Sequence, residues 1–515
     1  MLVVDSFKKR YLYKAFANGV LAMVNVVIQS IIPRGLGAAQ YGNFNYLTDF
    51  FTQLLGTINA GSSTGFYTKI SKRPQETKLI VFYFGYIVLA ILIAGCLVAV
   101  SSWGSWSNSL WPQLPVKYVY AAVIFAGLTW MFASLNDITD AYGLTVPAEI
   151  TKIAQRLLGL GLIAILFLGK WLNLDSIFYF QYAVILLGMF FLLQVIFRSG
   201  QGAWEWRLNK GEIYSYCREI YNYSRPLFGY ALVAVVTGIF DRWFLQTESG
   251  SIAQGFYSLS YKVGALCFIL TGAMTPLIMR EFSLAHHQKD IDLMAKVFRR
   301  YIPLMYAITT LISCFMAVNA GKLAVIFGGK EFNTLAAIVP IMIMSLYPMH
   351  QAYGQLSNAV FFSTDQTPLY AKVSIIFMII GVPLTYFLIA APRHHGLGIG
   401  ATGLALKAIG INILLTNVLL YFNAHYLKLR FSWYLLHQLL CFIAFLFLAA
   451  GTTFLVDHYL LNGGHIIAQI FLSGCCYCLF CAILIYFFPI VLGLGRENIL
   501  KALTLVSKRL FSGGN

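Results

Sequence analysis

Long apolar runs alternate with short polar stretches along the whole of this 515-residue chain. A helix needs about 20 apolar residues to cross a hydrocarbon core about 30 Å thick, and most of the runs have about that length. Charged residues, Pro or Gly bound the runs. The pattern therefore predicts fourteen membrane-spanning helices, near residues 15–33, 45–68, 79–101, 117–140, 148–169, 176–197, 222–245, 255–279, 301–319, 334–357, 369–391, 398–422, 433–456 and 465–489.

The polar stretch PRGLGAAQYGNFNYLTDF, residues 33–50, separates the first two predicted spans as an outward turn. Part of it, AAQYGNFNYL, is similar to IAQGFYSLSY at 252–261, with a shared Ala-Gln pair at 39–40 and 253–254. Both copies lie between an odd-numbered and an even-numbered span, as expected for parallel repeats. We expect an all-α polytopic membrane protein with two pseudo-symmetric six-helix lobes, residues 1–200 and 201–430, followed by two further helices and a basic tail, residues 431–515.

Composition supports the membrane assignment, because 59% of the residues are hydrophobic, only 11% are charged, and the mean hydropathy is +0.73. Soluble domains are about a quarter charged. With a cytoplasmic N-terminus, 23 of the 36 Lys and Arg residues fall in inward segments, five in outward ones and eight inside the spans as bounded above. This asymmetry predicts that both termini are cytoplasmic, and it explains most of the net charge of +17 without a nucleic-acid partner.

Several classes of protein are disfavoured by what the sequence lacks. It contains no G-x-x-x-x-G-K-[ST] loop and no H-E-x-x-H, so neither an ATPase nor a zinc protease of that type is expected. Four of the nine cysteines lie in CCYCLFC at 475–481, inside the last predicted span and without nearby His, Asp or Glu. We expect no metal site, no cofactor and no disulfide framework. The leader DSFKKRYLYK runs into a full-length span, so a cleavable signal peptide is not expected either.

Five segments carry a family resemblance, and they occur in the expected order along residues 10–430. They are RGLGAAQYGNF after the first span, YSRPLFGYALVAVVTGIFDRWFL around the seventh, AQGFYSLSYKVG at the eighth, KLAVIFGGKEFNTLAAIVPIMIMS before and in the tenth, and HHGLGIGATGLALKAIGI at the twelfth. These segments resemble polysaccharide-export flippases of the Wzx type, in the MOP superfamily that also includes MATE exporters and lipid II flippases. One departure is Leu277, which stands where the family has a small polar residue after a Pro.

The resemblance implies a flippase rather than an enzyme. Its substrate would be a polyprenyl-diphosphate-linked oligosaccharide, the repeat unit of an O-antigen, capsule or exopolysaccharide, moved from the cytoplasmic to the outer face of a bacterial inner membrane. Alternating access between two lobes, coupled to an ion gradient, is the implied mechanism. A polysaccharide polymerase and a chain-length regulator of the same pathway, together with membrane lipids, are the implied partners.

Charged residues inside spans are the candidates for substrate binding, because each costs about 2.5–3.5 kcal/mol to insert and normally faces a cavity or a partner. Bases exceed acids among them, which favours an anionic ligand. Lys262, Lys407 and Arg242, with Arg34 at the rim of the outward turn, are the expected phosphate-binding residues. For Arg242, pairing with the adjacent Asp241 or snorkelling to the interface is an equally open alternative.

Asp49 and Asp241 are the candidates for ion coupling, while capping or pairing near the turn is the alternative for Asp49. Asp49 and Lys262 occupy nearly equivalent places in the two lobes, so we expect them to face each other between the lobes. His350 is expected to be a buried, hydrogen-bonded histidine rather than a coupling residue.

Two other functions remain open at this stage. A MATE-like exporter of small cations would be expected to concentrate carboxylates rather than lysines in its cavity. A membrane polymerase or ligase should carry a sizeable outward loop with acids or arginines, whereas the longest outward segment here, residues 102–116, has no charged residue.

Overall fold

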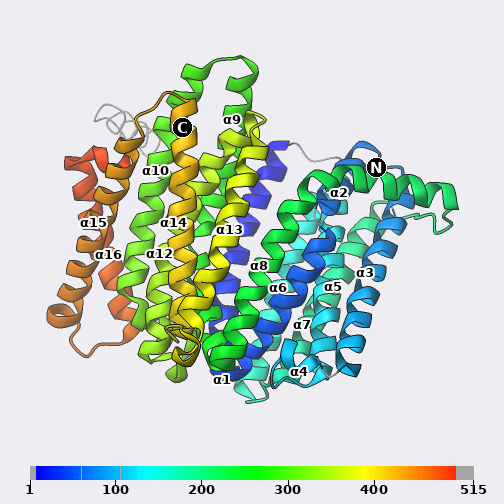
Figure 1. The fold of residues 1–515 in the computed structure, drawn as a ribbon, viewed down its shortest axis with the longest axis horizontal. Helices are drawn as coiled ribbons and strands as arrows, with labels where there is room; N and C mark the ends of the chain where they lie inside the picture. The colour runs from blue at the N-terminus through cyan, green and yellow to red at the C-terminus, as the bar shows by residue number, and fades with distance from the viewer. Residues whose placement is uncertain (1–6, 60, 105, 201, 494–515) are drawn as a thin grey trace, which may run out of the picture. The chain divides into compact units, whose positions relative to one another are not determined.

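The computed structural model describes residues 7–59, 61–104, 106–200 and 202–493, and this part of the chain is helical with no β-strand (Figure 1). Twelve of its helices are long and apolar enough to cross a membrane. Two of the twelve, α1 (Phe7–Asn59) and α8 (Lys210–Ala265), are each bent at an internal glycine and extend over two of the predicted spans. The expected all-α polytopic fold is confirmed.

The chain packs as two compact units. Unit 1 comprises Met1–Gly255, Phe327–Glu331 and Met378–Gly400. Inside it, α1 packs on α5 and α6, and α5 packs on α3 and α7. Its helices are α1, α2 (Ser62–Lys72), α3 (Thr77–Trp103), α4 (Ser107–Leu110), α5 (Val116–Ala141), α6 (Thr145–Leu168), α7 (Leu174–Arg198), most of α8, the second half of α13 (Thr367–Ile389) and the 3-10 turn η2 (Pro392–His394).

Unit 2 comprises Phe256–Ile326, Phe332–Phe377 and Ala401–Asn515. Helix α10 is its centre and packs on α9, α12 and α15. Its helices are the end of α8, α9 (Phe268–His287), α10 (Ile291–Val318), most of α11 (Ala320–Gly328), α12 (Leu335–Ser363), the first half of α13, α14 (Gly400–Tyr426), α15 (Phe431–Leu455), the π-helical turn η3 (Val456–Leu460), α16 (Ile466–Phe487) and the 3-10 turn η4 (Pro489–Leu492); the 3-10 turn η1 (Lys330–Phe332) joins the two units.

The glycine-rich stretch at 33–50 is not a loop, contrary to the prediction. It is helical on both sides of Gly37, the one residue of α1 with non-helical backbone angles. Figure 1 shows the two segments of α1 meeting beside the α1 label. A single left-handed glycine changes the direction of the chain without interrupting helix formation for more than one residue, so an extended turn is unnecessary.

Two predicted spans end earlier than expected. The span at 45–68 is divided, because α1 stops at Asn59 and α2 begins at Ser62 after Gly61, whose φ of 78° is left-handed. The Asn59 side chain accepts hydrogen bonds from the hydroxyls of Ser62 and Ser63, which stabilises this break. The span at 255–279 is likewise divided between the end of α8 at Ala265 and the start of α9 at Phe268. Apolar runs alone do not show such breaks.

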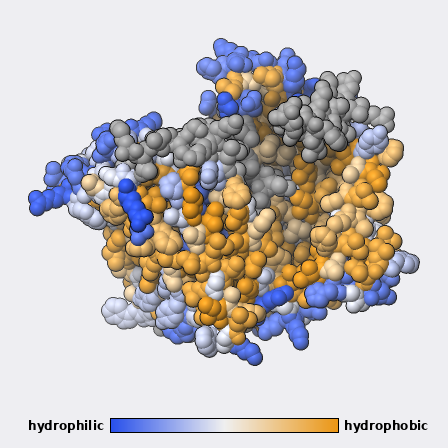
Figure 2. Space-filling model, turned by 180° about the vertical axis from the view of Figure 1, so that it is seen from behind, coloured by the Kyte–Doolittle hydropathy of each residue, from blue (hydrophilic) through white to orange (hydrophobic). Residues whose placement is uncertain are grey.

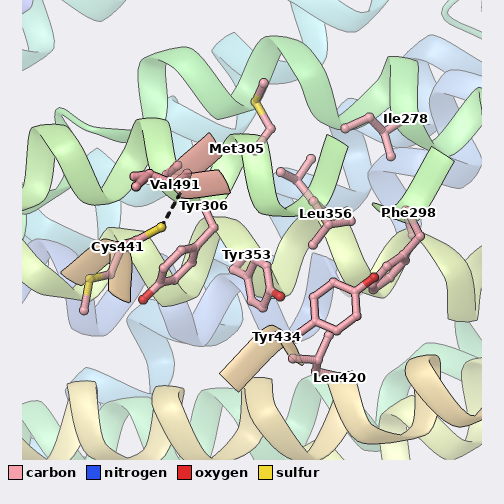
Figure 3. Packing of buried hydrophobic residues seen from close by; sticks show 14 of the residues in the cluster. Ile278, Phe298, Met305, Tyr306, Tyr353, Leu356, Leu420, Tyr434, Cys441 and Val491 are labelled. Atoms are coloured by element: carbon pink, nitrogen blue, oxygen red, sulfur yellow. Dashed lines mark hydrogen bonds between the residues drawn. The ribbon is translucent and has the colours of Figure 1, made fainter. Parts of the chain in front are cut away.

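Unit 2 has a continuous apolar core, part of which Figure 3 shows. Tyr306, Tyr353 and Tyr434 lie there among aliphatic side chains, and the Cys441 thiol donates to the Val491 carbonyl oxygen at 3.0 Å. On the face that Figure 2 shows, hydrophobic residues cover the middle and hydrophilic residues gather toward the ends. This distribution is the one that a surrounding bilayer favours.

Candidate functional site

The two bent helices contain the same unusual backbone conformation. Gly37 in α1 has φ 73° and ψ 169°, and Gly250 in α8 has φ 77° and ψ −179°. This region of backbone space is essentially restricted to glycine. The two glycines lie near the start of the two similar sequence stretches, so the bends give structural support to the internal repeat detected in the sequence.

Beyond the bends, α1 and α8 touch through their backbones. A Cβ atom added to Gly42 would lie 1.9 Å from the Ser251 carbonyl oxygen, and one added to Gly255 would lie 2.1 Å from the Ala38 carbonyl oxygen. The contact is reciprocal, since Ala38 and Gly42 follow the first bend as Ser251 and Gly255 follow the second. Small residues four positions apart allow helices this close an approach. When the two stretches are aligned on Gly37 and Gly250, their Ala-Gln pairs are displaced from each other by one residue.

The start of the second α1 segment is fixed by a residue far along the chain. The Ala38 backbone N–H donates to Glu331 Oε2 at 2.7 Å, which satisfies an amide that the bend leaves without a helical partner. Arg34, which precedes the bend in α1, lies beside the segment that carries Glu331, because a Cβ on Gly329 would come within 3.3 Å of Arg34 Cγ. Glu331 lies outside the predicted spans, so a search for charges inside spans could not find it.

Asp49 and Arg242 form an ion pair, with Arg242 Nη2 at 2.9 Å from Asp49 Oδ2. The Arg242 side chain is 11% exposed and that of Asp49 is 38% exposed, so the guanidinium is the more deeply placed partner. Arg242 therefore has a partner on α1, while the alternative of pairing with its neighbour Asp241 stays a prediction. Asp241 accepts a hydrogen bond from Thr385 Oγ1 of α13 at 2.7 Å. Neighbours in a helix point about 100° apart, which directs Arg242 and Asp241 to different helices.

A buried amide links α1 to α8 near the bends. Gln246 Nε2 donates to Asn43 Oδ1 at 3.2 Å and to Ser251 Oγ at 3.0 Å, and the Gln246 side chain is buried. Gln254, one turn beyond Gly250, is fully buried, and neither its amide oxygen nor its amide nitrogen has a hydrogen-bond partner in the described part of the chain. Unit 1 therefore concentrates polar side chains where its two bent helices meet.

The two candidate lysines belong to unit 2, where Lys262 of α8 and Lys407 of α14 are both partly buried. Lys262 follows Gly250 by twelve residues, as Asp49 follows Gly37, so the repeat places an ammonium and a carboxylate at equivalent positions. Their expected approach between the lobes stays a prediction. His350 is buried against the ring of Tyr306, as expected, and its Nδ1 has no hydrogen-bond partner among the described residues.

Unit 1 also contains a cavity of about 590 Å³ that sequence reasoning missed. Its lining is mainly apolar and aromatic, with Arg225 as the one charged residue among those described. Arg225 comes from α8, Phe82 and Tyr86 from α3, and Ile58 from the end of α1. In the sequence, Arg225 is one of many basic residues near a predicted cytoplasmic boundary, and nothing there distinguishes it from the others.

All nine cysteines are free. Within the described ranges, no group of three or more His, Cys, Asp or Glu residues has an arrangement that could hold a metal ion.

The arrangement of these helices matches the fold of transporters of the MOP superfamily. No protein-family model matches the sequence, and no curated protein matches it. Among solved structures, the lipid II flippase MurJ in an inward closed conformation covers 92% of this chain and 98% of its own, with 12% identity and a TM-score of 0.64. An inward-facing multidrug resistance MATE family transporter covers 81% and 96%, with 13% identity and a TM-score of 0.61.

A third similar structure is a MOP superfamily transporter from Pyrococcus furiosus, described as having a binding pocket of reverse polarity that suggests a different function. It covers 82% of this chain and 96% of its own, with 13% identity and a TM-score of 0.53. At these identities the comparisons establish a shared fold, one used by transporters and by a lipid flippase. Together with the twelve long apolar helices, this fold is that of a multi-pass membrane protein.

Proposed function

We propose that this protein is a flippase for a lipid-linked oligosaccharide joined to its polyprenyl carrier by a diphosphate. In this proposal it lies in a bacterial inner membrane with both termini in the cytoplasm and moves its substrate to the outer face. The lobes at 1–200 and 201–430 alternate in exposing a central path, and the helices at 431–515 lie outside the repeat. A polymerase and a chain-length regulator would act on the product.

The observation that carries the proposal is the cationic character of the charged positions in the spans. Lys262 stands in the second repeat where the first repeat has Asp49, and Lys407 adds a second ammonium in the same unit. An anionic diphosphate must exchange its water for positive groups as it enters a low-dielectric region. A cationic drug would need the opposite charge distribution, and the description of the Pyrococcus transporter indicates that pocket polarity varies within this fold.

The length of the match is a second support. The lipid II flippase covers 92% of this chain, whereas the MATE transporter covers 81%. The flippase therefore matches more of this chain than the MATE transporter does. The cavity beside Arg225 combines one cation with an apolar lining, as a site for part of an anionic lipid would.

The Asp49–Arg242 pair offers a route for ion coupling. While Asp49 is ionised it holds the Arg242 guanidinium at 2.9 Å. A proton or a metal cation bound to Asp49 would remove that attraction and release Arg242 to bind phosphate oxygens in bidentate fashion. In this proposal Asp49 senses the ion, Arg242 transmits the change, and Asp241 with Thr385 keeps the helix in position. Arg34 contributes a further cation at the rim of the outward end.

The test is complementation of a deletion strain, with lipid-linked oligosaccharide measured on both faces of the membrane. Lys262→Gln and Lys407→Gln should each reduce surface polysaccharide and leave lipid-linked precursor on the cytoplasmic face, at unchanged protein abundance. Lys372→Gln, which removes a charge one turn from the predicted cytoplasmic end of its span, is the matched control. Normal export by both variants would exclude the cationic path.

MATE-like export of a small molecule is the second candidate, favoured by the inward-facing MATE structure at a TM-score of 0.61. It predicts transport of a fluorescent cation by the purified protein in proteoliposomes. Such transport, together with normal surface polysaccharide in the deletion strain, would replace the flippase proposal.

A further inference from the structure

Unit 2 contains a cavity of about 450 Å³ that is unusually basic. Three cations line it, and the described residues around it include no acidic side chain. We call it the basic pocket. Its principal lining residues are Arg299, Lys428, Arg430, Trp433, Tyr434 and Gly493.

The basic pocket is held together by the connection between α14 and α15. Lys428 has a left-handed φ of 52°, and the turn is closed by a hydrogen bond from the Leu429 N–H to the Ala424 carbonyl oxygen at 2.7 Å. Arg430 is the N-cap residue of the 25-residue helix α15, and its side chain makes no capping hydrogen bond. The first amides of that helix and its positive dipole end therefore lie beside the cations. Arg299 comes from α10, a different part of the chain.

Basic residues are expected at this end of the helices, which is predicted to be cytoplasmic, and most of them need no ligand. The comparable cations of unit 1 show the ordinary arrangement, because Lys69 and Arg73 both pair with Glu219. Arg299, Lys428 and Arg430 form no ion pair with any described residue. Three like charges that converge on one cavity repel each other, and an anion would relieve that repulsion.

An apolar cavity of about 260 Å³ adjoins the basic pocket. Trp433 lines both cavities, and the remaining walls of the second one come from α15, α16 and η4. We call it the apolar slot. Its other lining residues include Leu436, Leu440, Ala444, Phe488 and Ile490.

We propose that the basic pocket and the apolar slot together bind one anionic phospholipid of the surrounding membrane. The phosphate lies among Arg299, Lys428 and Arg430, and part of an acyl chain lies in the apolar slot. Trp433 stands between the two, as tryptophan does at the boundary between headgroups and acyl chains. A free phosphate would leave the slot empty, and a neutral lipid would leave three cations without a partner. The lipid joins α10 to the α14–α15 connection and so stabilises unit 2 independently of the transported substrate.

The charge dependence is tested on the purified full-length protein with native mass spectrometry and thermal unfolding. Phosphatidylglycerol should remain bound and raise the midpoint temperature more than phosphatidylcholine does. Each neutralised cation should weaken phosphatidylglycerol binding about fivefold, so the combined variant R299Q/K428Q/R430Q loses the preference. Arg300→Gln is the matched control, because it removes the same charge from the neighbouring residue, whose guanidinium lies over the Tyr301 ring at 5.6 Å.

The contribution of the acyl chain is tested separately with Ala444→Phe, which fills the apolar slot and leaves the three cations in place. This variant should bind phosphatidylglycerol at least fivefold more weakly, and glycerol phosphate, which has no chain, should stabilise neither protein. If glycerol phosphate protects as well as the lipid does, the site is one for a soluble phosphate and the proposal is wrong. Equal losses for Arg300→Gln and Arg299→Gln would also overturn it, since the effect would then be general attraction to an anionic surface. If the combined variant does not fold, Lys428→Gln alone replaces it in the test of charge dependence.

Discussion

In α1, the amide that follows the bend donates to the Glu331 carboxylate, and a Cβ on Gly37 would lie 2.8 Å from one of its oxygens. In α8, a Cβ on Gly250 would meet nothing within 4 Å. The backbone angles of the two glycines are nevertheless almost the same. The two bends therefore share one backbone conformation, whereas their surroundings differ.

The difference extends along the helices that follow. Twelve residues beyond the bend, the first repeat has Asp49 and the second has Lys262. Asp49 is paired with Arg242 inside unit 1, while Lys262 is partly buried in unit 2. A common scaffold thus presents opposite charges at equivalent positions. The backbone contacts maintain the geometry, and the side chains are free to set the chemistry.

The largest effect is expected where the two repeats touch. Gly42→Ala and Gly255→Ala each place a methyl group within about 2 Å of a carbonyl oxygen of the other helix, which no rotamer can avoid. Each should lower the free energy of unfolding by about 3 kcal/mol, the upper part of the range for overpacking. Thermal unfolding of the purified variants measures this effect. Gly56→Ala, with open space around its Cβ, is the control, and an equal loss there would contradict the contact.

The two bends should differ from each other by a smaller amount. Gly250→Ala incurs only the backbone strain of its left-handed conformation, about 1–2 kcal/mol. Gly37→Ala incurs the same strain and also displaces Glu331, so it should destabilise the protein by about 1 kcal/mol more. Combining each variant with Glu331→Ala separates these contributions in thermal unfolding experiments. The difference between the two glycines should shrink when the Glu331 side chain is removed; a constant difference would mean that this side chain is not its cause.

The Asp49–Arg242 pair should show a modest coupling energy. Asp49→Asn and Arg242→Gln, made singly and together, form a double-mutant cycle in which we expect about 1 kcal/mol, between the values for exposed and buried pairs. The cycle Asp49→Asn with Lys117→Gln is the control, and it should be additive because Lys117 pairs with Asp175. Additivity in the first cycle would show that the ion pair is absent from the protein in solution.

The smallest effect concerns the ion pairs between the end of α2 and the N-terminal part of α8. Lys69 of α2 donates a hydrogen bond to Glu219 of α8, and Arg73 pairs with the same carboxylate. These contacts lower the pKa of Glu219 below its ordinary value of 4.5. A lowered pKa in the folded state stabilises the protein above pH 4.5, and this contribution disappears as the pH falls through the folded-state value. Because the group is partly exposed, it is worth less than about 1 kcal/mol.

Midpoint temperatures of the wild type and Glu219→Gln measure this contribution between pH 7 and pH 3. The wild type should be the more stable protein at pH 7, and the two curves should converge at the acid end. Parallel curves would show that Glu219 is not ionised in a paired state. Glu281→Gln, at a carboxylate on α9, is the control substitution.

Apolar runs were sufficient to predict the helices and the fold class, since the length of a span is set by the bilayer and not by tertiary contacts. The same runs could not locate the breaks at Gly61 and near Cys267, because a one-residue change of backbone angle leaves the hydropathy unchanged. The register of the repeat was displaced by one residue for a related reason. Letters such as Ala-Gln can match by chance, whereas Gly42 and Gly255 are fixed by the space available between two helices.

Sequence reasoning named Asp49 and Arg242 as candidates but could not predict that they pair. The apolar runs placed both residues in spans, and only the structure shows that they meet. Glu331 and Thr385 were missed because their roles depend on segments far away in the chain. Arg225 and the basic pocket were indistinguishable from ordinary loop cations until the cavities beside them were visible.

The reciprocal contact between Gly42 and Gly255 also constrains how the protein can evolve. Each glycine faces a carbonyl oxygen, and every amino acid carries that oxygen, so no replacement of Ser251 or Ala38 creates room for a larger residue at either position. A clash between two side chains can be relieved by a second substitution in the partner. Here a genetic screen for suppressors of Gly42→Ala should recover revertants to glycine and no compensating change at Ser251.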